Sequence, residues 1–333
     1  MKEPLVSITI PTYNRPDYLK QALASAVGQT YRNTEIIVSD NASPVSAQSI
    51  VDSFADSRIR FHQYPQSVSM FSNHIGGFCM ATGKYVASLH DDDIWESDFL
   101  EKMVSPLEAD PELIMTFCNQ WVIDENSVVS LEQTEKYNTR LGRHKLHRQT
   151  YRPFMRVGLG DLAVQPASSA VIRREGIDWS RIPEKVGPTW DVYVSYLLAS
   201  TGQGAYFVPE KLACYRIHSQ SDTGGAENLK SKMQHAFNQM NCYEAIMEDD
   251  ALQKTLGEEM FEMIEYRWQH ACTSMGLGLL KSSQVREARR FLFQSLSRKY
   301  MDPRTWAATG ISLIPHPFHR IREEILEVMV KAK

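Results

Sequence analysis

Three consecutive aspartates, Asp91–Asp93, constrain the fold and chemistry of this chain more than any other stretch. They directly follow Tyr85–Leu89 and His90, and the apolar segment has the length and composition of a buried strand. Carboxylates this close repel one another, and each resists leaving water. A divalent cation such as Mg²⁺ or Mn²⁺ would balance them, because both ions prefer oxygen ligands. The alternative is a solvated turn, in which Asp93 caps a helix that begins near Trp95.

Strands and helices are predicted to alternate before this triplet. The pattern predicts strands at 5–12, 34–39, 59–62 and 85–89, and helices at 16–27, 47–55 and 71–81. Such alternation is typical of a doubly wound α/β sheet, which binds its ligand at the carboxyl ends of the strands. We therefore expect Thr12–Asn14, Asp40–Asn41 and Asp91–Asp93 to meet in one crevice.

The residues after the first strand exclude two common ways of binding a nucleotide. Neither the glycine fingerprint of dinucleotide-binding folds nor the P-loop pattern occurs there. A cation at the triplet is then the better candidate for holding phosphates. The net charge of −4 gives no reason to expect a nucleic-acid partner. The five cysteines lack zinc-ligand or disulfide spacing, so we expect a reducing, cytoplasmic setting.

Three segments in this order, residues 7–16, 35–43 and 81–93, resemble the family-2 glycosyltransferases of the GT-A fold. The resemblance is good over about the first 125 residues and looser to residue 222. It implies a mixed, doubly wound sheet with a Rossmann-like nucleotide half and an acceptor half. We expect a catalytic domain at 1–222 and a helical C-terminal extension at 223–333.

The resemblance also implies a donor nucleotide pocket lined by Pro11, Thr12, Tyr13, Asp40, His74 and Asp91. Tyr13 would stack near the base, and Asp40 would accept a hydrogen bond from the N–H edge of uracil or thymine. Asp91 would contact the ribose. A basic residue that many members carry before the aspartates is missing, and His74 is the nearest substitute for binding the diphosphate. From the residues alone, Asp40 is equally well a turn residue and Tyr13 a packed aromatic.

On the metal and acceptor side, the resemblance implies Asp92 as the main metal ligand, Asp93 as an auxiliary ligand and His218 as a completing ligand. Asp191 matches the family's general base, which removes the proton of the acceptor hydroxyl. Trp190 and Ser168 would bind the acceptor. The alternatives are that Asp191 only stabilises a helix N-terminus, that Trp190 is core and that His218 is structural. Arg216 has a structural role as its simplest interpretation.

Two further segments leave their roles open. The basic segment 140–156 is either a solvated loop or a mobile lid that meets a diphosphate or an anionic acceptor. After residue 227, apolar residues recur at helical spacing and predict core packing or a homodimer contact. Residues 319–333 are amphipathic, so they either pack on the protein or lie on an anionic membrane surface.

Together these features predict a metal-dependent inverting glycosyltransferase that uses Mn²⁺ or Mg²⁺. It would transfer a sugar from a UDP- or dTDP-sugar to a hydroxyl of a glycan or lipid-linked glycan, in polysaccharide biosynthesis. We expect it in the cytoplasm, with contact to the inner face of the membrane as one option. The alternatives are a sugar nucleotidyltransferase, whose glycine- and arginine-rich loop is missing, and a catalytically inactive nucleotide-sugar-binding module.

Overall fold

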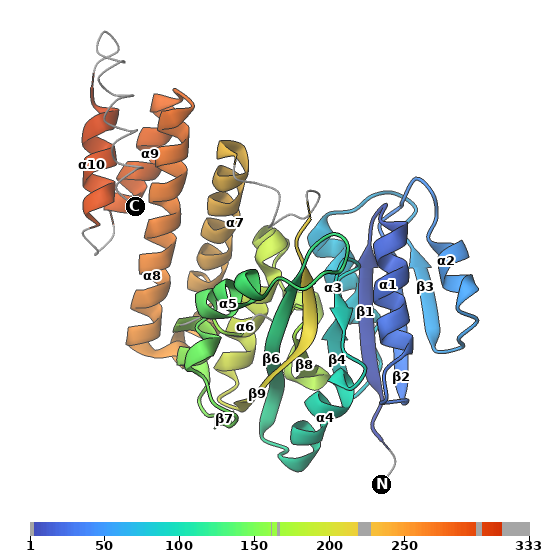
Figure 1. The fold of residues 1–333 in the computed structure, drawn as a ribbon. Coiled ribbons are helices and arrows are strands. Elements are labelled where there is room, and N and C mark those ends of the chain that lie inside the picture. Colours follow the sequence, from blue (N-terminus) through green and yellow to red (C-terminus); the bar gives the residue numbers. More distant parts are fainter. Residues whose placement is uncertain (1–2, 161, 165–166, 219–227, 298–301, 315–333) are drawn as a thin grey trace. The chain divides into compact units, whose positions relative to one another are not determined.

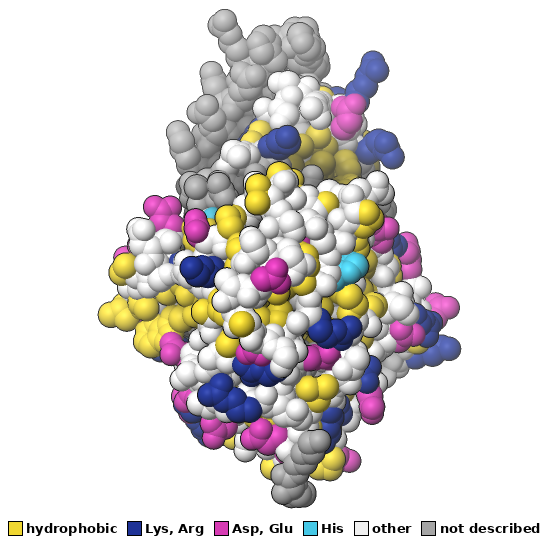
Figure 2. Space-filling model, turned by 90° about the vertical axis from the view of Figure 1, so that its right-hand side faces the viewer, with side chains coloured by type: hydrophobic (Ala, Val, Ile, Leu, Met, Phe, Trp, Pro, Cys, Tyr) yellow, Lys and Arg dark blue, Asp and Glu magenta, His cyan; other side chains and the backbone are white. Residues whose placement is uncertain are grey.

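The computed structural model describes residues 3–160, 162–164, 167–218, 228–297 and 302–314. The chain divides into two compact units, Met1–Gly224 and Gly225–Lys333, and each is described by itself (Figure 1). On the face drawn in Figure 2, basic and acidic side chains of the described residues are interspersed.

Four parallel strands form one half of the sheet in the first unit. They are β1 (Val6–Thr12), β2 (Thr34–Asp40), β3 (Ile59–Gln63) and β4 (Tyr85–Ser88), in the spatial order β3-β2-β1-β4. The connecting helices are α1 (Pro16–Val27), α2 (Gln48–Ser53) and α3 (Met70–Met80). Every residue of β1, β2 and β4 is buried, as expected of parallel strands covered on both faces. The predicted alternation of strands and helices is confirmed.

The second half of the sheet is mixed. Strand β8 (Ala170–Arg173) runs antiparallel between β4 and β6 (Leu113–Ile123). The long strand β9 (Gly204–Arg216) is parallel to β6, and the short strands β5 (Ile94–Trp95) and β7 (Thr150–Tyr151) pair with it. Three 3₁₀ segments at 174–176, 179–181 and 184–189 lead into α6 (Trp190–Ser200), which follows β8.

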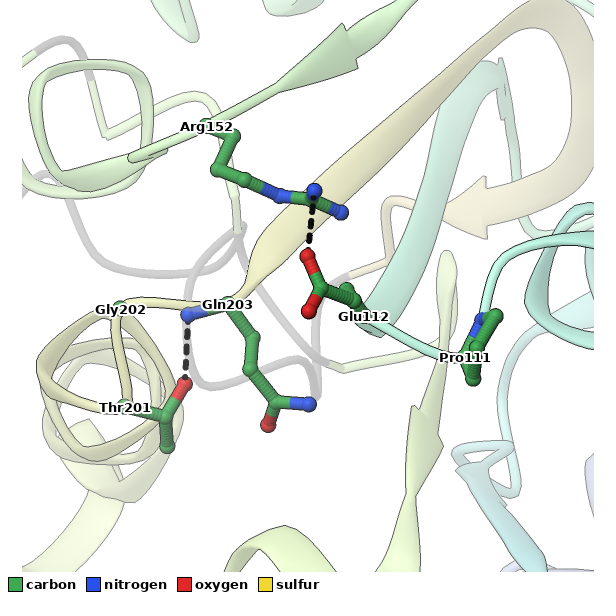
Figure 3. Close-up of a pocket in the computed structure, with 6 residues that line it drawn as sticks. All are labelled: Pro111, Glu112, Arg152, Thr201, Gly202 and Gln203. Carbon is green, nitrogen blue, oxygen red and sulfur yellow. Dashed lines mark hydrogen bonds and ion pairs between the residues drawn. The ribbon is translucent and has the colours of Figure 1, made fainter.

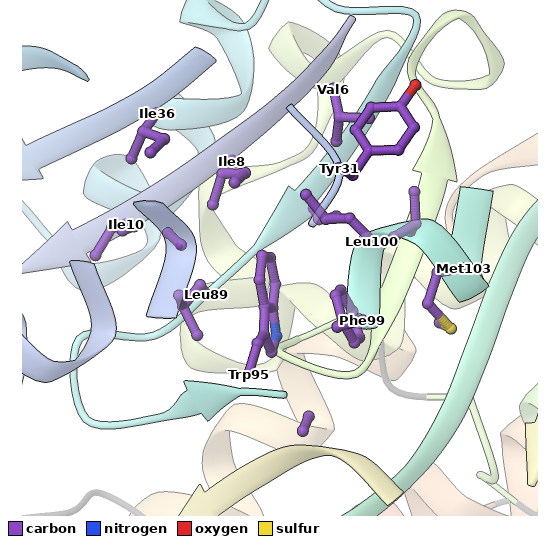
Figure 4. Packing of buried hydrophobic residues seen from close by; sticks show 14 of the residues in the cluster. Val6, Ile8, Ile10, Tyr31, Ile36, Leu89, Trp95, Phe99, Leu100 and Met103 are labelled. Carbon is purple, nitrogen blue, oxygen red and sulfur yellow. The ribbon is translucent and has the colours of Figure 1, made fainter. Parts of the chain in front are cut away.

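The main core lies between this sheet, α1 and α4 (Phe99–Ala109) (Figure 4). Ile8 and Ile10 of β1 point into it, and the rings of Trp95 and Phe99 stack 4.2 Å apart. Trp95 lies in strand β5, and the next helix, α4, begins at Phe99. The alternative interpretation of Asp93 as the cap of a helix near Trp95 is wrong.

The basic segment 140–156 keeps most of its basic side chains exposed, but a few contacts anchor it to the rest of the unit. It follows α5 (Leu131–Arg140) and contains a 3₁₀ turn at Arg143–Lys145 and strand β7. The guanidinium of Arg143 is buried and donates to the carbonyls of Ala163 and Cys118 at 2.8 and 2.7 Å. Arg148 pairs with Glu210. These contacts tie the segment to the sheet, and a π-helical turn at Arg156–Gly160 follows.

Arg152 of this segment lines a shallow pocket with Pro111, Glu112, Thr201, Gly202 and Gln203 (Figure 3). Its guanidinium lies 2.9 Å from Glu112 and 3.1 Å from Asp110. The pocket is at the amino ends of β6 and β9, whereas a doubly wound sheet binds its ligand at carboxyl ends. We assign it no role in the reaction.

The second unit contains α7 (Leu229–Met247), α8 (Asp250–Lys281), α9 (Val285–Leu296) and α10 (Pro303–Ser312). A cluster built from Leu279, Leu280, Ala288, Leu292, Ala308 and Ile311 holds α8, α9 and α10 together. Core packing was one of the two predicted uses of these apolar residues. Among the helices that the structure describes, none combines the length and the apolar content that crossing a bilayer would require. The amphipathic residues 319–333 lie outside the described residues.

Candidate active site

The three polar strand ends lie next to one another, as the sequence predicts. Thr12 and Asp40 are partners in the register of β1 and β2, and the Asn41 N–H donates to the Thr12 carbonyl at 2.9 Å. The Thr12 hydroxyl donates to Asp91 Oδ2 at 2.8 Å. These contacts join the ends of β1, β2 and β4 into one surface. The N-terminus of α1 follows β1 there, and a helix N-terminus favours anions.

Arg15 bridges the first two aspartates of the triplet. Its Nη1 lies 3.1 Å from Asp91 Oδ1 and 2.9 Å from Asp92 Oδ2. On the same Asp92 oxygen, His218 Nε2 makes a contact of 3.1 Å. Burial and the charge of Asp92 raise the pKa of Asp91, although Arg15 and Thr12 oppose the rise. The sequence analysis assigned no role to Arg15, which stands in the Tyr-Asn-Arg-Pro segment after β1.

Asp93 points to a different set of partners. Its Oδ2 accepts from the Ser168 hydroxyl at 2.5 Å, and its Oδ1 accepts from the Arg216 N–H at 3.0 Å. Ser168 is 1% exposed and orients Asp93, and its predicted role in binding an acceptor stays a prediction. Arg216 Nε donates to the Asp92 carbonyl at 2.7 Å, which agrees with a structural role. Asp93 thus links the triplet to the residues before β8 and to the end of β9.

The donor atoms near the triplet fit a divalent cation. One ligand atom each from His90, Asp92 and Asp93 lies within 4.8 Å of the others. Two carboxylates suit Mg²⁺ or Mn²⁺, and an imidazole nitrogen is a further ligand. His90 was missed from the sequence, although it directly precedes the triplet. Asp92 belongs to this group and also contacts His218, so the two histidines lie near the same carboxylate.

An aromatic cluster connects the triplet with α6. The ring of His74 lies 5.1 Å from that of His90 and 5.5 Å from that of Trp190. Burial and the neighbouring His90 lower the pKa of His74 to about 3, which favours its neutral form. Trp190 is 2% exposed and packs on Phe78, which fits the alternative interpretation of a core residue. The predicted roles of His74 at the diphosphate and of Trp190 at the acceptor stay predictions.

Asp191 lies in the first turn of α6, immediately after Trp190. Its Oδ1 accepts from the N–H of Val192 at 2.9 Å. Burial raises the pKa of Asp191 to about 6. Burial also raises the pKa of Tyr137, and the negative charges of Asp93 and Asp191 add to this rise. Asp191 follows Trp190, whose ring is connected to that of His90 through the ring of His74.

Asp40 makes contacts that fit the alternative interpretation of a turn residue. Its carboxylate is fully buried and accepts from the N–H groups of Ser43 and Ala47 at 2.9 and 3.1 Å. The Gln63 amide donates to it at 3.2 Å. These donors hold the loop after β2, and the predicted contact of Asp40 with a base stays a prediction. Tyr13, in contrast, is 49% exposed at the end of β1, and Pro11 is buried within that strand.

Comparison with known proteins agrees with this geometry. The family model described as glycosyl transferase family 2 matches residues 7–178. An uncharacterized glycosyltransferase of Rickettsia typhi is 26% identical over 260 residues, which are 77% of this chain and 74% of that protein. The UDP-Glc:alpha-D-GlcNAc-diphosphoundecaprenol beta-1,3-glucosyltransferase of Escherichia coli is 31% identical over 39% of this chain. That match spans about half of the E. coli protein, 51% of its length.

Two solved structures are similar in fold. The S. aureus TarS 1–349 structure in complex with UDP-GlcNAc has a TM-score of 0.63 at 13% identity, covering 96% of this chain and 88% of TarS 1–349. The Pyrobaculum calidifontis mannosyltransferase in complex with GDP-Man and Mn²⁺ has a TM-score of 0.59 at 17% identity, covering 99% and 86%.

The chain therefore belongs to glycosyl transferase family 2, and it is a glycosyltransferase. The predicted GT-A fold, with a mixed central sheet and C-terminal helices, is confirmed.

Proposed function

We propose that this protein transfers a sugar, with inversion, from a nucleoside-diphosphate donor to a hydroxyl of a glycan or lipid-linked glycan. In this proposal Thr12, Tyr13 and Asp91 line the donor site and Asp92 binds a divalent cation. Asp191 is the general base. The observation that carries the proposal is the contrast between two sets of carboxylates. Asp91 and Asp92 contact the Arg15 guanidinium, while Asp191 accepts from a backbone N–H and burial raises its pKa to about 6.

Each set fits one half of an inverting transfer. A carboxylate with a pKa near 6 is unprotonated at neutral pH and still basic enough to accept the acceptor's hydroxyl proton. As the hydroxyl oxygen forms a bond to the anomeric carbon, the bond to the diphosphate breaks on the opposite face. Asp92 would hold the cation, with His90, His218 and Asp93 as further candidate ligands. A divalent cation there would stabilise the charge that develops on the departing diphosphate.

The donor base is proposed from the relatives. The E. coli relative is named for UDP-Glc, and the S. aureus structure contains UDP-GlcNAc, which favours a UDP-sugar with dTDP as the second choice. The mannosyltransferase structure contains GDP-Man, so guanine belongs in the test. Mn²⁺ in that same structure favours Mn²⁺ over Mg²⁺ as the first ion to try.

A lipid-linked acceptor is proposed from the E. coli relative, whose name specifies a diphosphoundecaprenol-linked sugar. Such an acceptor would place the reaction in polysaccharide biosynthesis, at the cytoplasmic face of a membrane.

The test is a calorimetric titration of the full chain with UDP, dTDP and GDP, each with and without Mn²⁺. We expect metal-dependent binding of UDP that Asp92→Asn abolishes, because the substitution removes a negative charge from the cation's main ligand. Asp110→Asn is the matched control, since it removes a partly exposed carboxylate at the amino end of β6. If none of the three nucleotides binds under any condition, the proposed donor site is wrong. Equal binding by the Asp92→Asn variant would remove Asp92 from the metal site.

A further inference from the structure

The turn between β1 and α1 directs Arg15 at the aspartate triplet. Asn14 adopts a left-handed conformation, with φ of 53°, and its N–H donates to the Ser43 hydroxyl at 2.8 Å. Arg15 has φ of −130° and ψ of 61°, outside the helical region that a following proline disfavours. Pro16 then begins α1. The turn therefore fixes where the Arg15 side chain leaves the backbone, beside Asp91 and Asp92.

A single nitrogen of Arg15 contacts both carboxylates. Nη1 lies 3.1 Å from Asp91 Oδ1 and 2.9 Å from Asp92 Oδ2. The side chains of Asp91 and Asp92 are 6% and 12% exposed, so water screens the pairs weakly. The Arg15 side chain is 22% exposed, which leaves it an open side toward solvent. Arg15 thus contacts an oxygen of Asp92, the residue that the proposed metal site uses.

Charge balance makes Arg15 and a divalent cation competitors. Asp91, Asp92 and Asp93 carry three negative charges when all are ionised, and the Arg15 guanidinium lowers this sum to two, so it reduces the attraction for a divalent cation. A divalent cation binds a carboxylate oxygen at about 2.0–2.6 Å, so a guanidinium nitrogen on the same carboxylate would be its close, like-charged neighbour. The attraction for the cation increases when Arg15 leaves the pair or when a diphosphate brings negative charge.

We propose that Arg15 competes with the divalent cation for Asp92, so that the protein without nucleotide binds the cation weakly. In the complex with donor, the diphosphate draws Arg15 away from Asp92, and the cation is retained together with the nucleotide. This inference rests on the proposed function, because it takes Asp92 as the metal ligand. Arg15 is then a positioning residue, and it supplies a basic group near the diphosphate.

The test is a Mn²⁺ titration of the full chain without nucleotide, followed by electron paramagnetic resonance of free Mn²⁺. We expect Arg15→Gln to bind Mn²⁺ about tenfold more tightly than the unchanged protein, because one like charge is removed from the site. Arg15→Met, which keeps the aliphatic stem, should do the same, and Arg15→Lys should stay near the unchanged protein. Arg60→Gln is the matched control: it makes the same charge change by removing an ion pair to Glu35, at 2.7 Å, away from the triplet.

A second readout has the opposite sign. With Mn²⁺ present, Arg15→Gln should bind UDP more weakly than the unchanged protein, since the released guanidinium contacts the diphosphate in our proposal. A purely structural role would weaken both kinds of binding together. One outcome would overturn this inference alone. In that outcome, Arg15→Gln and Arg15→Met bind Mn²⁺ no more tightly than the unchanged protein, while Asp92→Asn loses Mn²⁺. Asp92→Asn binding Mn²⁺ normally would overturn the metal assignment and this inference with it.

Discussion

Two strand ends in this protein carry buried carboxylates, and their partners differ in kind. Asp40, at the end of β2, accepts from two backbone N–H groups and from the Gln63 amide. Asp91 and Asp92, after β4, contact side chains, namely those of Thr12, Arg15 and His218. Backbone donors cannot leave unless the chain refolds, whereas side chains leave by rotating about single bonds. The first carboxylate therefore holds a loop in place, and the other two can exchange their partners for a ligand.

Among the substitutions considered, Asp92→Asn should have the largest effect on activity. Asp92 is one of the carboxylates whose side-chain partners can be exchanged for a ligand. We expect the transferase kcat/KM to fall by about 10³-fold, because the main anionic ligand of the cation is lost. The free energy of unfolding should change little, since the amide oxygen still accepts from Arg15. Rates with a labelled sugar nucleotide and urea unfolding measure the two quantities. A stable variant with full activity would show that the Asp92 charge has no part in transfer.

Asp191 is a third kind of carboxylate, which accepts a hydrogen bond from the N–H of Val192, and Asp191→Asn tests it. We expect about a 10²-fold loss of kcat with donor binding retained, because a general base acts only in the transfer step. In the unchanged protein kcat should rise as pH increases through about 6 and then level off, because Asp191 accepts a proton only when ionised. The variant should lack this rise. A variant that keeps the rise assigns the pH dependence to another group.

Asp40→Asn should give the smallest effect on chemistry and the clearest one on folding. An amide nitrogen in place of either oxygen faces a donor instead of accepting from it, so we expect about 1–3 kcal/mol of lost unfolding free energy. Activity per folded molecule should fall only a few-fold. Urea unfolding of Asp40→Asn beside Asp92→Asn is the direct comparison. The interpretation of Asp40 as a loop anchor fails if the variant is as stable as the unchanged protein and has lost affinity for UDP.

The succession of strands and helices in the first half of the sheet was predictable from the sequence because local patterns carry that information. Apolar runs of strand length, interrupted by Pro16 and by polar turns, placed the carboxyl ends of β1, β2 and β4 at one edge. The identity of each partner was not predictable in the same way. Ser168 meets Asp93 across 75 positions, and Arg216 reaches Asp92 across 124. Such contacts depend on how the second half of the sheet closes, and no local periodicity encodes them.

The same limit explains why the burial of Trp190 and Arg143 was not predicted. Both occur in segments whose composition is compatible with a binding surface, yet both are buried. Trp190 packs on Phe78 of α3, more than a hundred positions away, and Arg143 donates to the carbonyls of Ala163 and Cys118. Their burial becomes visible only when the elements around them are in place.

The rings of His90, His74 and Trp190 connect the end of β4 to the start of α6, where Asp191 lies. Asp91 and Asp92 are positioned by hydrogen bonds at the edge of a buried sheet, whereas the direction of Asp191 depends on how these rings pack. Segments held mainly by packing open at lower free energies than central strands. On warming, we expect sugar transfer to fail at a lower temperature than nucleotide binding, so the enzyme would pass through a state that holds its donor and cannot use it.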